Sequence, residues 1–103
     1  MVAGDRDQSL MSGRGPDWFT DAYTHSPGAT HLLTLFGAEH SPGGIPNWEA
    51  AETTDENPER VAVLQRLTAA YLRSALNPSD TSWKRASCAL ADAGSAIGRI
   101  DSK

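Results

Sequence analysis

The 103-residue sequence has very little cysteine, no long apolar run and no block of charge of one sign. The single Cys88 excludes an internal disulfide and any cysteine-rich metal site. Nowhere do ~18 apolar residues follow one another, and the chain does not open with a basic segment and an apolar run. The sequence therefore predicts neither a membrane span nor a signal peptide. Localisation stays open, with the cytoplasm favoured if Met1 is the true start.

The charge and the apolar content limit the function classes further. Thirteen acidic residues stand against nine basic ones, giving a net charge of -4, so the sequence predicts neither nucleic acid nor an anionic membrane as a partner. Only 39% of the residues are hydrophobic, and they are concentrated in four short stretches of the sequence. We therefore expect at most one domain, with a small core.

Residues 1–40 are predicted to hold two strand-and-loop units. The first is the end of an apolar strand, 1–4, that runs into a charged loop, and because no turn or cap precedes it we expect the chain to be a piece of a longer protein. Pro16 favours the first turn of a helix that extends to about Thr24. The apolar run 31–36, bounded by Gly28 and Gly37, is typical of a strand buried on both faces of a parallel sheet.

The remainder is predicted to be a long loop over 41–57, two helices over 58–94 and a weakly specified tail over 95–103. Asn57 and Pro58 are a good N-cap and first position, and apolar residues then repeat on one face as far as Leu76. Asp80 caps a second helix that Gly94 ends.

Two segments place an ionisable side chain at the same distance beyond a predicted strand. Gly4 is followed after two residues by Asp7, and Gly37 is followed after two residues by His40. Because neighbouring parallel strands end at one edge of a sheet, we expect these two side chains to meet. A carboxylate in that position can hold the imidazole in one tautomer and stabilise the imidazolium that forms when it takes up a proton.

This order of motifs resembles the acid and histidine loops near the end of α/β-hydrolases, which place Asp before His and both after the serine. The sequence is most similar to chlorophyllase, dienelactone hydrolase and platelet-activating-factor acetylhydrolase-like esterases, and the segments 61–76 and around Trp83 share the likeness. The resemblance implies a partial α/β-hydrolase fold, with two parallel strands, flanking helices and no complete sheet. It makes Asp7 the triad acid and His40 the base, whereas Asp5 falls too near the strand end.

The sequence departs from that family in lacking any Gly-x-Ser-x-Gly nucleophile elbow. Ser41 is the nearest mimic, but no glycine leads it and it lies beside His40. We therefore expect the C-terminal part of a carboxylic ester hydrolase that is inactive alone and uses no cofactor. Its expected partners are the missing N-terminal hydrolase lobe or a second copy, with a small ester as substrate once completed. Trp48 is the candidate substrate-binding residue.

Other interpretations of the same residues stay open. Asp5 or Asp7 alone is more often a loop residue that bonds nearby backbone, and His40 alone is more often an ordinary loop histidine. A metal site made by His40 with Glu39 and the other two histidines, His25 and His31, is conceivable, but the spacings match no standard ligand pattern. A different class of function is a non-catalytic interaction module, in which the helices over 58–76 and 80–94 present an apolar face to a partner.

Overall fold

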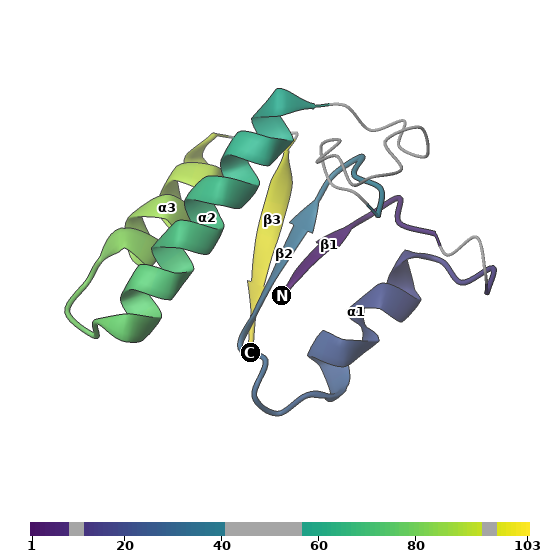
Figure 1. Cartoon of the computed structure of the whole chain (residues 1–103), viewed down its shortest axis with the longest axis horizontal. Helices are drawn as coiled ribbons and strands as arrows, with labels where there is room; N and C mark the ends of the chain where they lie inside the picture. Colours follow the sequence, from purple (N-terminus) through teal and green to yellow (C-terminus); the bar gives the residue numbers. More distant parts are fainter. Residues whose placement is uncertain (9–11, 41–56, 94–96) are drawn as a thin grey trace.

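The computed structural model describes residues 1–8, 12–40, 57–93 and 97–103. These residues form a mixed α/β structure, as predicted. The elements follow in the order β1 (Val2–Gly4), α1 (Pro16–His25), β2 (His31–Leu35), α2 (Pro58–Leu76), α3 (Ser82–Asp92) and β3 (Gly98–Ser102) (Figure 1).

The three strands form one mixed sheet with β2 in the middle. β1 pairs with β2 in parallel, and β3 pairs with the other edge of β2 in the antiparallel direction. The prediction of two strands was therefore incomplete, because the tail forms a third. Its five residues include a single strong strand former, Ile100. They form a strand because they pair with residues about 70 positions earlier in the chain, and local composition cannot predict such a pairing.

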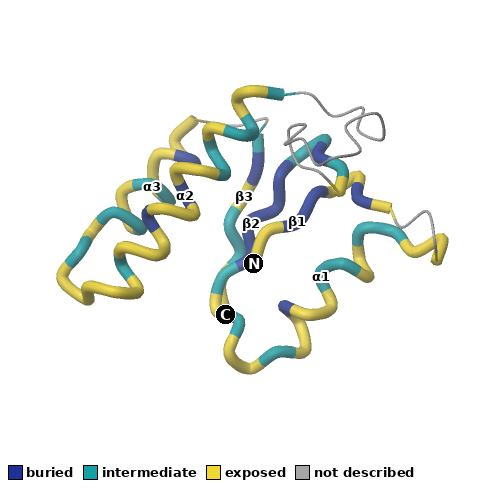
Figure 2. The backbone as a smooth tube through the Cα atoms, in the orientation of Figure 1, coloured by how far each residue is buried: buried dark blue, intermediate teal, exposed yellow. Residues whose placement is uncertain are grey.

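Helices cover both faces of this sheet. α2 and α3 lie together on one side and α1 on the other (Figure 1). Leu33 and Leu35 of β2 pack against Leu67 of α2 and Leu90 of α3, whereas Leu32 faces the α1 side. The prediction that β2 is buried on both faces is confirmed, and Figure 2 shows β2 as a continuous buried stretch of the backbone.

Local capping signals set the helix ends. The side chain of Asn57 accepts hydrogen bonds from the backbone N–H groups of Glu59 (3.0 Å) and Arg60 (3.2 Å), which fixes the start of α2 at Pro58. α3 begins at Ser82, one residue later than a cap at Asp80 predicts, and the Asp80 carboxylate accepts from the N–H of Ser82 as a capping side chain does. Both Gly94 and most of the predicted loop lie outside the described residues.

The last residue ties α1 to the sheet. The backbone N–H of Lys103 donates to Thr30, and its ammonium group donates to the carbonyls of Tyr23 and, at 2.9 Å, Ser26. The same ammonium lies 4.6 Å from the centroid of the Tyr23 ring. Because the carbonyls at a helix C-terminus carry partial negative charge, a lysine here stabilises the end of α1.

The outer side of α2 leaves large apolar side chains in solvent. Leu72 is 54% exposed and Leu76 86%. Of the helices in the described ranges, none combines the length and the apolar character that a membrane crossing requires.

Candidate functional site

The candidate site lies where β1 and β2 end. The two strands are parallel, and Gly4, the last residue of β1, is in register with Leu35, the last residue of β2. The loops that follow therefore leave the sheet side by side from the same edge, as the parallel arrangement requires. Residues 5–7 form the first of these loops and residues 36–40 the second.

The structure brings Asp7 and His40 together at the tips of these loops. The Nδ1 atom of His40 lies 3.2 Å from each of the two carboxylate oxygens of Asp7. The Asp7 side chain is only 8% exposed, whereas the His40 side chain is 77% exposed. The carboxylate is thus held inside the protein and the imidazole stands on its surface.

This geometry assigns different roles to the two ring nitrogens. A carboxylate that accepts from Nδ1 favours the tautomer with its proton on that nitrogen, which leaves Nε2 with a lone pair. Within the described ranges, Asp7 is the only hydrogen-bond partner of the His40 ring. The pair can therefore act as an oriented base directed toward solvent or toward another surface.

Backbone hydrogen bonds hold the two loops against each other. The N–H of Asp5 donates to the carbonyl of Leu35 at 3.1 Å, and the N–H of Arg6 donates to the carbonyl of Ala38 at 3.0 Å. Ala38 is fully buried, and its side chain belongs to the core that α2 and α3 form with the sheet. The pairing of β1 with β2 thus continues beyond the strands and reaches to within one residue of Asp7.

Both glycines of the repeated pattern have a steric reason to be glycine. A Cβ atom on Gly4 would collide with the backbone carbonyl of Ala38, so only glycine allows the loops to approach this closely. Gly37 has φ of +70° and is the third residue of a turn in which the N–H of Ala38 donates to Leu35 at 3.4 Å. A side chain at that dihedral angle would be strained.

An aromatic side chain of α1 also reaches the site, although no sequence motif pointed to it. The ring centroid of Phe19 lies 5.6 Å from that of His40, with the rings tilted by 52°. The ring centroid of Trp18 lies 4.9 Å from that of Phe19, and these two rings are in an edge-to-face arrangement. Trp18 and Phe19 lie in the predicted helix that begins at Pro16. Their positions in that helix carry no information on which residue of another element they contact.

Of the remaining candidate residues, His25 and His31 lie away from this site. Trp48 and Ser41 lie outside the described residues. The structure places His25 in the last turn of α1 and His31 at the start of β2, at the opposite end of that strand from His40. Over the part of the chain that the structure describes, no three His, Cys, Asp or Glu side chains are grouped closely enough to hold a metal ion.

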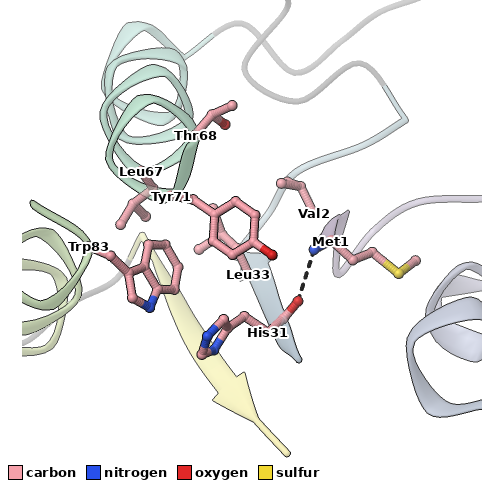
Figure 3. A pocket seen from close by; sticks show the side chains of 8 residues that line it. All are labelled: Met1, Val2, His31, Leu33, Leu67, Thr68, Tyr71 and Trp83. Atoms are coloured by element: carbon pink, nitrogen blue, oxygen red, sulfur yellow. Dashed lines mark hydrogen bonds between the residues drawn. The ribbon is translucent and has the colours of Figure 1, made fainter. Parts of the chain in front are cut away.

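A small apolar cavity opens at that opposite end of the strands. Its volume is about 150 Å³, and Figure 3 shows the side chains of β1, β2, α2 and α3 that surround it. The rings of His31, Tyr71 and Trp83 contact one another there, with centroids between 5.0 and 6.1 Å apart. The Nδ1 atom of His31 lies 2.8 Å from the hydroxyl oxygen of Ser102 in β3, and this hydrogen bond orients the ring that lines the cavity.

Comparison with protein families, with curated proteins and with solved structures found no match for this chain. The likeness to α/β-hydrolases therefore rests on the order and spacing of the sequence motifs.

Proposed function

We propose that this chain is the C-terminal part of a serine hydrolase acting on carboxylic esters, to which it contributes the acid Asp7 and the base His40. The observation that supports the proposal most is the 3.2 Å approach of the buried Asp7 carboxylate to Nδ1 of the exposed His40 ring. Two parallel strands present this pair at their shared edge, where open parallel sheets commonly place functional groups.

The proposed chemistry assigns a task to each atom of the pair. Nε2 of His40 takes the proton from a serine hydroxyl as the serine oxygen attacks the ester carbonyl, and it returns that proton to the departing alcohol. The Asp7 carboxylate keeps the imidazole oriented and stabilises the positive charge that the ring then carries. Water, activated by the same nitrogen, finally releases the acid from the serine. The serine comes from another segment or another chain.

The proposal makes a direct prediction about the coding sequence that precedes Met1. We expect an in-frame segment that encodes a Gly-x-Ser-x-Gly elbow, and we expect the isolated chain to show negligible turnover of a chromogenic short-chain ester. When the two parts are produced together, ester hydrolysis should appear. The absence of such a segment, or of hydrolysis by the completed protein, would remove the proposal.

The role of His40 is then tested in the completed protein. We expect His40→Ala to lower kcat by ~10³-fold or more, because the serine loses its base, while the fold stays intact. His25→Ala is the matched control, since it changes a histidine at the end of α1 and should leave the rate unchanged. Full activity in His40→Ala would show that the pair has no catalytic role.

A second candidate function is a non-catalytic interaction module, favoured by the apolar side chains that α2 exposes. Leu72 and Leu76 are four residues apart and therefore neighbours on one helix face. Light scattering after size exclusion should then show dimers that Leu72→Lys converts to monomers. A folded chain that remains monomeric at about 0.1 mM would argue against this function.

A further inference from the structure

We infer that Asp5 is a positioning residue for the Asp7–His40 pair, through a hydrogen bond from its carboxylate to the loop that carries the histidine. The Oδ1 atom of Asp5 accepts from the backbone N–H of Gly37 at 2.6 Å. This inference rests on the proposed function. It gives a distinct role to Asp5, which lies too near the end of the strand to be the triad acid.

Asp5 is the residue at which the two loops are tied most closely. Its backbone N–H donates to the carbonyl of Leu35, and its side chain accepts from Gly37, so a single residue spans both sides of the turn after β2. Asp7 follows it by two residues, and His40 follows Gly37 by three. Displacement of either contact therefore shifts one member of the pair relative to the other.

The conformation of Gly37 explains why a side-chain acceptor is needed. A glycine at φ of +70° has neighbouring conformations of similar energy, because no Cβ restricts it. In the described structure the residues on either side are held by backbone bonds, Phe36 to the carbonyl of Ile97 at 2.8 Å and Ala38 to that of Leu35. The Gly37 N–H instead points to Asp5, and an ionised acceptor makes a short, strong bond.

Without that acceptor, the Gly37 N–H would turn toward water and the turn would sample other conformations. His40 has no second hydrogen-bond partner in the described ranges to keep its ring in place, and it is largely exposed. The 3.2 Å contact with Asp7 therefore depends on where the turn places the histidine backbone. Asp5 acts on the pair through the chain and touches neither ring nor substrate.

The tautomer of His40 reports this effect without any assay of activity. Long-range proton–nitrogen correlation spectra of the ¹⁵N-labelled chain at about pH 8.5, where histidine is ordinarily neutral, show which ring nitrogen carries the proton. Substitution of His25 and His31 by Gln assigns the three signals. The unmodified chain should carry the His40 proton on Nδ1.

Asp5→Ala should lower the ratio of the Nδ1-protonated to the Nε2-protonated form of His40 by about tenfold, equivalent to ~1.4 kcal/mol. Asp5→Asn keeps a neutral acceptor, which makes a bond about half as strong, and should lower the ratio by about threefold. Asp17→Ala is the matched control, since it removes an exposed acid from α1 and should change nothing.

An unchanged ratio in folded Asp5→Ala would overturn the inference. If that variant does not fold, Asp5→Asn decides in its place: a threefold fall supports the inference and an unchanged ratio overturns it. A different result, with the His40 proton on Nε2 in the unmodified chain, would instead show that the Asp7–His40 pair does not form. That outcome counts against the proposed function, so the two failures are distinguishable.

Discussion

Replacement of Leu35 by alanine tests the fold that carries the candidate site. Among the described residues, Leu35 is the largest side chain that is completely buried, and it packs with Leu33, Leu67 and Leu90 between the sheet and the two helices. Its backbone carbonyl also accepts from the first residue of the Asp7 loop. The substitution therefore removes three side-chain carbon atoms from the centre of the larger core and leaves a cavity.

The expected loss follows from that burial. Leu→Ala changes at such positions lower the free energy of unfolding by about 3–4 kcal/mol, through lost transfer energy and the cavity that remains. A domain of this length has a total of about 5–15 kcal/mol. With an m-value of ~1.5 kcal/mol/M, a loss of 3 kcal/mol lowers the midpoint of urea denaturation by ~2 M.

Urea denaturation followed by tryptophan fluorescence measures this shift, because Trp83 packs against the same core. Leu76→Ala is the matched control: the same atoms are removed from a side chain that is 86% exposed, and the change should stay within about 0.5 kcal/mol. Equal midpoints for the two variants would refute the burial of Leu35 and the packing of α2 and α3 on the sheet.

Two further predictions concern charged side chains. Hydrogen bonds from the hydroxyl and the backbone N–H of Ser82 hold the pKa of Asp80 below its ordinary value of 3.8. The stability that this carboxylate contributes is therefore present above that value and is lost as the pH falls through the lowered pKa. Asp80→Ala should be less stable than the unmodified chain in urea at pH 7, and the difference should disappear near pH 2; a constant difference would contradict this cause. Lys103→Met keeps the side-chain stem but removes the ammonium from the end of α1, and we expect a loss of about 1 kcal/mol. The thermal midpoint should fall by ~4–8 °C, whereas Lys84→Met, which lacks these contacts, serves as the control; equal midpoints would show that the ammonium does not stabilise α1.

The helices and the central strand could be predicted from the sequence because their signals are local. Pro16, Asn57 and Pro58 mark helix starts whatever the rest of the chain does, and the apolar run of β2 requires burial on both faces. The approach of Asp7 to His40 was also predictable, since it follows from one general rule about where parallel strands end.

Other features depend on partners far away in the sequence. β3 is a strand because its backbone completes the edge of β2, and the cavity beside His31 exists because α2 and α3 pack against that same end of the sheet. The amino-acid composition of these segments predicts neither the third strand nor the cavity.

The sequence by itself determined which ionisable residues follow the ends of β1 and β2, where α1 and α2 begin, and that β2 is an interior strand. Only the tertiary structure decided that Phe19 lies against His40 and that the carboxylate of Asp5 binds the Gly37 turn while that of Asp7 meets the imidazole. The physical reason is that spacing along the chain fixes which residues follow the two parallel strands at the same edge of the sheet. The direction in which each side chain then turns is set by close contacts between loops that are 30 residues apart or more.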